Sequence, residues 1–265
     1  MKKSKFLAVL MAAGVFMTFA MGSGSSTPSS TTTVSVESSS TEENTGSSSE
    51  TTEKPVEEDE VLYEITDTSF EYYTNSIGSV EYYGYVEITN TGKSNLYLSK
   101  AVFDMEDNDG HLLQSDDFIS KAPSVIKPGE KGYFYNGLGS NLIDEGVSTD
   151  NGIKLVPQIT VKKATGEPKR YEVTDTDIKE DSLGKPKVTG RVINDTSEEI
   201  GYLYLNVIFY DKEGKVLAIT GTSVTEVPAN GKGSFECSAM FANDNAKMDN
   251  IADYEIIAEE TYMQF

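Results

Sequence analysis

Apolar and polar residues alternate along much of the chain from Val61 onward, with the period of two that is typical of β-strands. Over residues 80–89, one face of the expected strand carries Val80, Tyr82, Gly84, Val86 and Ile88, and the other carries Glu81, Tyr83, Tyr85, Glu87 and Thr89. Over residues 202–210, Leu203, Leu205, Val207 and Phe209 alternate with Tyr202, Tyr204, Asn206, Ile208 and Tyr210. The face with Phe209 is expected to meet a core, and the face with Tyr210 to be the wetter one.

The second half of the chain repeats the first. The first copy contains Gly84-Tyr85-Val86, Asn90, Asp109-Gly110 and Lys131-Gly132-Tyr133-Phe134, and the second contains Gly190-Arg191-Val192, Asn194, Glu213-Gly214 and Lys232-Gly233-Ser234-Phe235. The Asp-Gly and Glu-Gly pairs are typical of tight hairpin turns. Counting back from these turns aligns Ala101 with Leu205 and leaves Leu96 and Leu98 on the wrong face, which predicts a β-bulge before Ala101.

Helix signals are limited to one expected turn at 245–253, and strands at 153–162 and 254–263 end the two copies. Short strands at close, regular spacing predict an all-β chain with two tandem antiparallel β-sandwich domains. A charged break at 175–185 places their boundary, giving modules at 61–178 and 179–265. The repeat predicts that residues 183–265 fold alone.

The N-terminus carries the pattern of a secretory signal peptide, assigned to residues 1–22. Lys2, Lys3 and Lys5 precede a largely apolar run that ends in small residues, as a signal peptidase requires. The run is shorter than the roughly 20 residues of a membrane span, although a retained anchor is the alternative. Residues 23–60 are rich in Ser, Thr and Glu and predict a disordered linker.

The stretch from Val188 to Phe235 resembles the FxLYD module of bacterial exported proteins. The residues that carry the resemblance are Val188-Thr189-Gly190-Arg191-Val192-Ile193-Asn194, Val207-Ile208-Phe209-Tyr210-Asp211 with the following turn, and Gly231-Lys232-Gly233-Ser234-Phe235. The first copy matches less well, since Asp104-Met105-Glu106-Asp107 replaces the Tyr-Asp centre. The resemblance implies immunoglobulin-like sandwiches on an exported protein, often a lipoprotein. No cysteine directly follows the apolar run, so no lipid anchor is predicted.

Charge and composition exclude several kinds of chemistry. The net charge of −21 repels phosphate backbones, so nucleic acid is not expected as a partner. One His and one Cys cannot supply the ligands of a zinc site, and His111 would have to serve any Ser-His-Asp arrangement. No phosphate-binding loop precedes a helix. We therefore expect that the chain is not an enzyme and needs no cofactor.

Two clusters remain as candidate sites. The acidic residues Asp104, Asp107 and Asp109 surround a hairpin turn and are candidate Ca²⁺ ligands, the alternative being a solvated acidic hairpin. Tyr73, Tyr83 and Tyr85 are candidates for an aromatic binding patch for a sugar or a protein, the alternative being cross-strand packing.

These features predict a non-catalytic, exported cell-envelope protein with two β-sandwich modules on a flexible stalk, used for binding or as a spacer. Its partner would be a cell-envelope or extracellular protein or glycan, and the mature form would have no membrane span. A Ca²⁺- or carbohydrate-dependent adhesion module is one alternative, and an enzyme with an unrecognised carboxylate site is another. The ligand, the oligomeric state and the angle between the modules are not set by the sequence.

Overall fold

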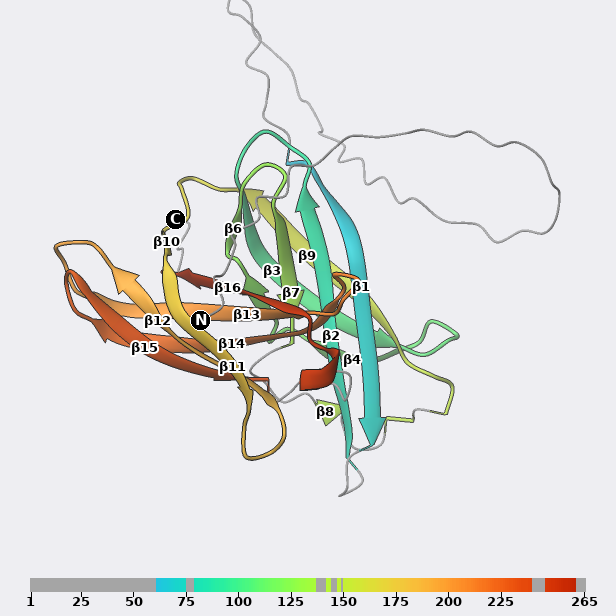
Figure 1. The fold of residues 1–265 in the computed structure, drawn as a ribbon. Coiled ribbons are helices and arrows are strands. Elements are labelled where there is room, and N and C mark those ends of the chain that lie inside the picture. The colour runs from blue at the N-terminus through green and yellow to red at the C-terminus, as the bar shows by residue number, and fades with distance from the viewer. Residues whose placement is uncertain are drawn as a thin grey trace, which may run out of the picture. The chain divides into compact units, whose positions relative to one another are not determined.

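The computed structural model describes residues 61–74, 79–136, 142–143, 147–148, 150–239 and 246–260 (Figure 1). Within these ranges the protein is all-β, as predicted, and every regular element is a strand except the 3-10 turn η1, Met248–Asn250. This turn lies inside the segment 245–253 where the sequence predicts one. Residues 1–60, which hold the predicted signal peptide and linker, lie outside the described residues.

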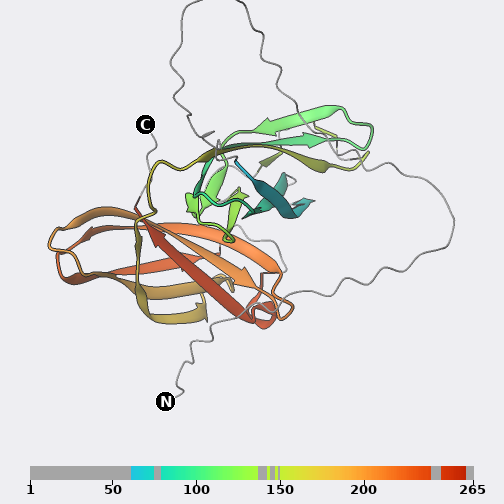
Figure 2. The same cartoon turned by 90° about the horizontal axis from the view of Figure 1, so that it is seen from above.

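The strands of the first half form two antiparallel sheets. Their bounds are β1 Tyr63–Thr74, β2 Val80–Asn90, β3 Leu96–Glu106, β4 Leu112–Asp116, β5 Ser120–Ala122, β6 Val125–Ile126, β7 Lys131–Tyr135, β8 Leu142–Ile143 and β9 Lys154–Lys163. One sheet has the order β1-β2-β7-β5, with β8 on β2, and in the other β3 pairs with β4 and β6 and also with β9. Figure 2 shows the sheet of β3, β4 and β9 beside the sheet of β1, β2 and β7.

The strands of the second half form two further antiparallel sheets. Their bounds are β10 Arg170–Tyr171, β11 Val173–Glu180, β12 Pro186–Asn194, β13 Ile200–Tyr210, β14 Val216–Val227, β15 Gly231–Ser238 and β16 Asp253–Glu259. The sheets have the orders β11-β12-β15 and β10-β16-β13-β14.

The strand order of the first half recurs in the second. The order β1-β2-β7 reappears as β11-β12-β15, and β9-β3-β4 reappears as β16-β13-β14. The predicted boundary between residues 178 and 179 lies within β11. β11 pairs with β12, so the whole strand belongs to the second half. The charged break at 175–185 corresponds to the second part of β11 and its turn into β12.

The expected bulge in β3 is present. The pairing of β3 with β9 shifts in register between Leu98 and Lys100. The extra residue returns the alternation to the core face, so that Leu96 and Leu98 on one side of the bulge and Ala101 and Phe103 on the other are all buried. The prediction of a bulge before Ala101 is therefore confirmed.

The repeated asparagines each fix a corner of their own half. Asn90 donates its amide hydrogens to the carbonyls of Ser94 and Ile126, and Asn194 donates to those of Glu198, Val227 and Pro228. Both side chains are fully buried, and their amides satisfy backbone acceptors that would otherwise be buried without partners. The sequence repeat therefore marks a structural device.

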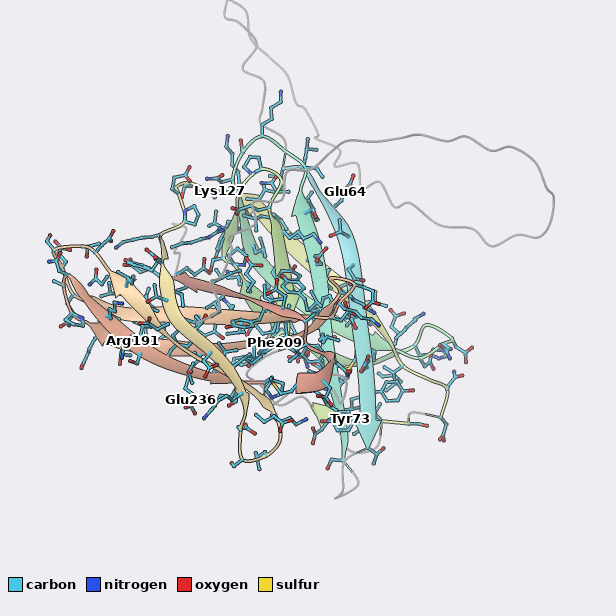
Figure 3. The ribbon with its side chains drawn as sticks, viewed as in Figure 1. Glu64, Tyr73, Lys127, Arg191, Phe209 and Glu236 are labelled. Atoms are coloured by element: carbon cyan, nitrogen blue, oxygen red, sulfur yellow. The ribbon has the colours of Figure 1, made fainter. Side chains whose placement is uncertain are left out.

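Phe209 lies in the core of the second half, as the alternation predicts (Figure 3). Leu203, Leu205 and Val207 on the same face of β13 are also fully buried. The opposite face differs from expectation, because Asn206 and Ile208 are buried as well. β13 is therefore covered on both faces, and residues of the first half of the chain cover the face that carries Asn206 and Ile208.

Candidate functional site

The predicted acidic cluster is divided by the structure. Asp104 is buried, and its carboxylate accepts hydrogen bonds from the Ser115 hydroxyl and the Gln158 amide. Asp107 and Asp109 instead lie close to His111 at the exposed β3–β4 turn, where one ligand atom from each lies within 4.8 Å of the others. Asp104 is not a member of that group.

The carboxylate of Asp107 shapes the β3–β4 turn. It accepts hydrogen bonds from the backbone N–H groups of Asp109 and His111, each at 2.9 Å, and contacts the His111 ring at 3.0 Å. These bonds, led by that from the His111 backbone, lower the pKa of Asp107 to about 2. The turn ends at Gly110, whose φ of +87° favours glycine.

Two other hairpins use the same turn. Asp211 accepts from the N–H groups of Glu213 and Lys215, and Asp181 accepts from those of Leu183 and Lys185. Because the same Asp geometry recurs at Asp181 and Asp211, the position of Asp107 is explained by turn formation. The carboxylate of Asp107 therefore has a structural role in forming the β3–β4 turn.

The three predicted patch tyrosines do not share one exposed surface. Tyr73 is 44% exposed near the end of β1 (Figure 3), whereas Tyr83 and Tyr85 are 2% and 1% exposed. The hydroxyl of Tyr73 donates to Glu81 at 2.6 Å. Tyr83 and Tyr85 belong to a core cluster whose other members come mostly from the second half. Tyr83 and Tyr85 are therefore buried against the second half, a contact that the expected cross-strand packing does not include, although Tyr85 also packs edge-on against Tyr133 of β7.

Tyrosines of β2 and β7 join the two halves of the chain. The Ile219 N–H donates to the Tyr83 hydroxyl at 2.6 Å, and the Tyr135 hydroxyl donates to Asn206 Oδ1 at 2.6 Å. Burial raises the pKa of Tyr83 and of Tyr135 well above the usual range, so both hydroxyls stay protonated as neutral hydrogen-bonding groups. We call this set of contacts, together with Tyr85 and Tyr133 in the same cluster, the tyrosine junction.

Charged groups continue the contact between the halves. Glu259 in β16 is 3% exposed and accepts from the Ser124 N–H at 2.7 Å and from its hydroxyl at 2.8 Å. Arg170 in β10 forms an ion pair with Glu130 at 2.9 Å and donates to the Val125 carbonyl at 2.7 Å. The halves are therefore joined by apolar, polar and ionic contacts together.

Replacing Glu259 with Gln should stabilise the protein at neutral pH. Burial raises the pKa of Glu259 from its ordinary value of 4.5. A raised folded-state pKa favours the protonated carboxyl, so its contribution to stability is present below pH 4.5 and is lost as the pH rises through the folded pKa. Gln keeps an oxygen that can accept from Ser124 and carries no charge. Melting temperatures measured from pH 4 to 8 check this.

The expected Glu259→Gln minus wild-type difference is positive at pH 8 and declines toward the acid end. Glu236→Gln in β15, at an exposed position, provides the control and should show no such trend. A Glu259→Gln variant less stable than wild type at pH 8 would contradict the expected effect of burial.

The single cysteine has no sign of reactivity. Cys237 lies 2% exposed in the core of the second half, and burial raises the pKa of its thiol to about 12. A thiol with that pKa carries almost no thiolate at neutral pH and is a poor nucleophile. Cys237 is therefore a core residue.

A polar cleft of about 460 Å³ lies where β1, the β13–β14 turn and η1 meet. The lining residues are Ser69, Glu71, Asp211, Lys212, Glu213, Lys215, Val216, Leu217, Asp249, Asn250, Ile251 and Ala252. Carboxylates outnumber lysines in this set. The sequence could not indicate this cleft, because its walls come from segments far apart in the chain.

No family model matches this chain, and no curated protein matches it. The part of the chain that the structure describes contains no helix long and apolar enough to cross a membrane.

Proposed function

We propose that this chain is a non-catalytic exported cell-envelope protein in which two immunoglobulin-like β-sandwiches, carried on a Ser/Thr-rich stalk, act as one rigid piece for binding or spacing. The observation that carries the proposal is the tyrosine junction. A spacer or a presenting head needs a fixed geometry, and buried hydrogen bonds such as that of Tyr135 with Asn206 restrict motion between the halves.

The repeated strand order supports the tandem sandwich assignment. Each half has a sheet that contains the order β1-β2-β7 or β11-β12-β15, next to a sheet built on β3 or β13. Paired antiparallel sheets of about seven strands are typical of immunoglobulin-like domains, and the second half has seven strands, β10 to β16. The FxLYD resemblance in the second half agrees with that assignment and with export.

The chemical groups within the described residues support a non-catalytic role. His111 lies at an exposed turn paired with Asp107, and the Cys237 thiol is buried. A nucleophile, a base and an orienting group within hydrogen-bond reach are the signature of covalent catalysis. Among the described residues, neither His111 nor Cys237 lies in such an arrangement.

Expression of the whole chain in a bacterium tests the exported part of the proposal. N-terminal sequencing of material outside the cytoplasm should give a mature end after Ala20 or Gly22, because the small residues there suit a signal peptidase. Protein that keeps Met1 and fractionates with membranes would show a retained anchor. Protein that stays in the cytoplasm would overturn the proposal.

A further inference from the structure

β1 is a long strand at the margin of its sheet. It spans 12 residues, Tyr63–Thr74, and its only strand partner among the described residues is β2 (Figure 1). Proteins protect such edges with charged side chains, especially Lys, with Pro or with β-bulges, and the one register shift of β1 lies near its start, between Ile65 and Asp67. β1 contains neither Lys nor Pro, whereas β9, at the margin of the other sheet in this half, contains Pro157 and three lysines.

The pairing of β2 shows which backbone groups of β1 face the open side. Gly84 donates its N–H to Asn136 Oδ1 at 2.6 Å, and its carbonyl accepts from the Asn136 N–H at 3.2 Å. Both groups of Gly84 therefore point away from β1. Phe70 lies opposite Gly84, and opposed residues in antiparallel strands exchange both hydrogen bonds or neither. The N–H and carbonyl of Phe70 therefore point to the open edge.

The backbone N–H and carbonyl groups of alternate residues of β1 point to the same open edge. Successive residues along a strand present their backbone groups to opposite sides, so Thr68 and Tyr72 share the orientation of Phe70. The Thr68 N–H is occupied by the side chain of Asp67 at 2.9 Å. Among the described residues, the backbone groups of Phe70 and Tyr72 have no partner at this edge, and they present donors and acceptors in register for another strand.

The polar cleft lies along this segment of β1. Ser69 and Glu71 form one wall, and Glu213 and Asp249 lie on the other elements that line it. Ser69 and Glu71 share one face of β1, and an added strand would place every second side chain over that same face. The acids of the cleft, Glu71, Glu213 and Asp249, would meet those side chains beside Lys212, which forms an ion pair with Glu213 at 3.6 Å, so the site keeps a net negative charge.

We propose that the open edge of β1 binds an extended basic segment of another protein, which adds one strand to the β1-β2-β7-β5 sheet. Strand addition gives affinity through main-chain hydrogen bonds and selectivity through alternate side chains. The acids of the cleft select Lys or Arg at every second position by charge complementarity. This inference rests on the proposed binding role and specifies the chemistry of the partner.

A synthetic decapeptide in which Lys and Thr alternate is the probe, and the same peptide with Glu in place of Lys is its control. The whole protein should bind the Lys peptide and leave the Glu peptide unbound, as measured by fluorescence anisotropy. Hydrogen exchange at the Phe70 and Tyr72 amides should slow on binding, and exchange along the edge of β9 should not change. Equal binding of both peptides, or unchanged exchange in β1, would overturn the proposal.

Two kinds of variant separate the edge from the cleft. Tyr72→Pro removes an edge N–H and should weaken binding, whereas Tyr72→Ala keeps the N–H and should retain more of it; circular dichroism confirms that both fold. The triple variant Glu71→Gln, Glu213→Gln, Asp249→Asn should weaken binding roughly tenfold, since each exposed charge pair contributes modestly. Glu236→Gln on β15 is the matched control and should bind as wild type does.

Other outcomes are equally informative. If β1 pairs with a second copy of the chain, the protein will sediment as a dimer whose β1 amides are already protected, and the proposal of a basic partner fails. Failure to bind the Lys peptide by a properly exported protein would reject this inference alone. A chain that is not exported would reject the proposed function instead.

Discussion

Phe209→Ala is expected to lower the free energy of unfolding by about 3–5 kcal/mol, the range for truncating a buried aromatic side chain. Phe209 has no exposed surface and lies in the core cluster of the second half. The cost arises from lost apolar burial and from the cavity that surrounding side chains cannot refill. Urea denaturation followed by circular dichroism measures the change.

Tyr210→Ala is the matched control on the opposite face of β13. Tyr210 is only partly buried, and its hydroxyl contacts Glu255 at 3.1 Å and Tyr133 at 3.5 Å. It should therefore cost clearly less than Phe209→Ala. If Tyr210→Ala proves the more damaging, every inward assignment along β13 is one residue out of register.

Tyr135→Ala should destabilise the protein by a similar amount, about 3–5 kcal/mol. Tyr135 is fully buried in the tyrosine junction, and its ring lies in the cluster shared with the second half. Its removal also takes away the donor to Asn206 Oδ1, an acceptor that is itself buried. Because the lost contacts join the halves, the unfolding transition should also broaden or split.

Tyr135→Phe separates the hydroxyl from the ring. It keeps the apolar packing and leaves Asn206 Oδ1 without the Tyr135 hydroxyl as donor, which costs about 1–3 kcal/mol for a buried group. The transition should stay single, since the aromatic contact remains. If Tyr135→Ala costs no more than Tyr135→Phe, the ring does not hold the halves together.

Residues close together in sequence could be assigned from the sequence with some accuracy. The alternation of residues 203–209 identified the buried face of β13, and the position of Gly110 located the bulge in β3. Both signals are local, because side chains alternate strictly along a strand and an extra residue reverses that alternation. The recurrence of Asn90 and Asn194 likewise predicted a repeat that the strand order shows.

Contacts between distant segments could not be predicted in the same way. Asn206 and Ile208 were expected on the wetter face of β13, yet tyrosines of β2 and β7 bury them. A tyrosine suits both a wet surface and a buried interface, since its ring is apolar and its hydroxyl can bond. An isolated segment 183–265 would expose this covered face and would lack β10 and β11.

The candidate sites were the least predictable feature. Asp104, Asp107 and Asp109 are neighbours in sequence, but strand alternation and the turn send Asp104 into a buried polar contact away from the other two. The polar cleft has no local signature at all, since Glu71 and Asp249 belong to opposite ends of the folded segment. Binding surfaces formed by segments far apart in the sequence can be recognised only in the tertiary structure.

Differential scanning calorimetry of the whole protein tests the central claim, that the tyrosine junction makes the two halves one cooperative unit. We expect a single transition whose calorimetric and van't Hoff enthalpies agree, as a two-state unit requires. Two resolved transitions, each with the enthalpy of about half the folded chain, would contradict the claim and would show that the halves are independent modules.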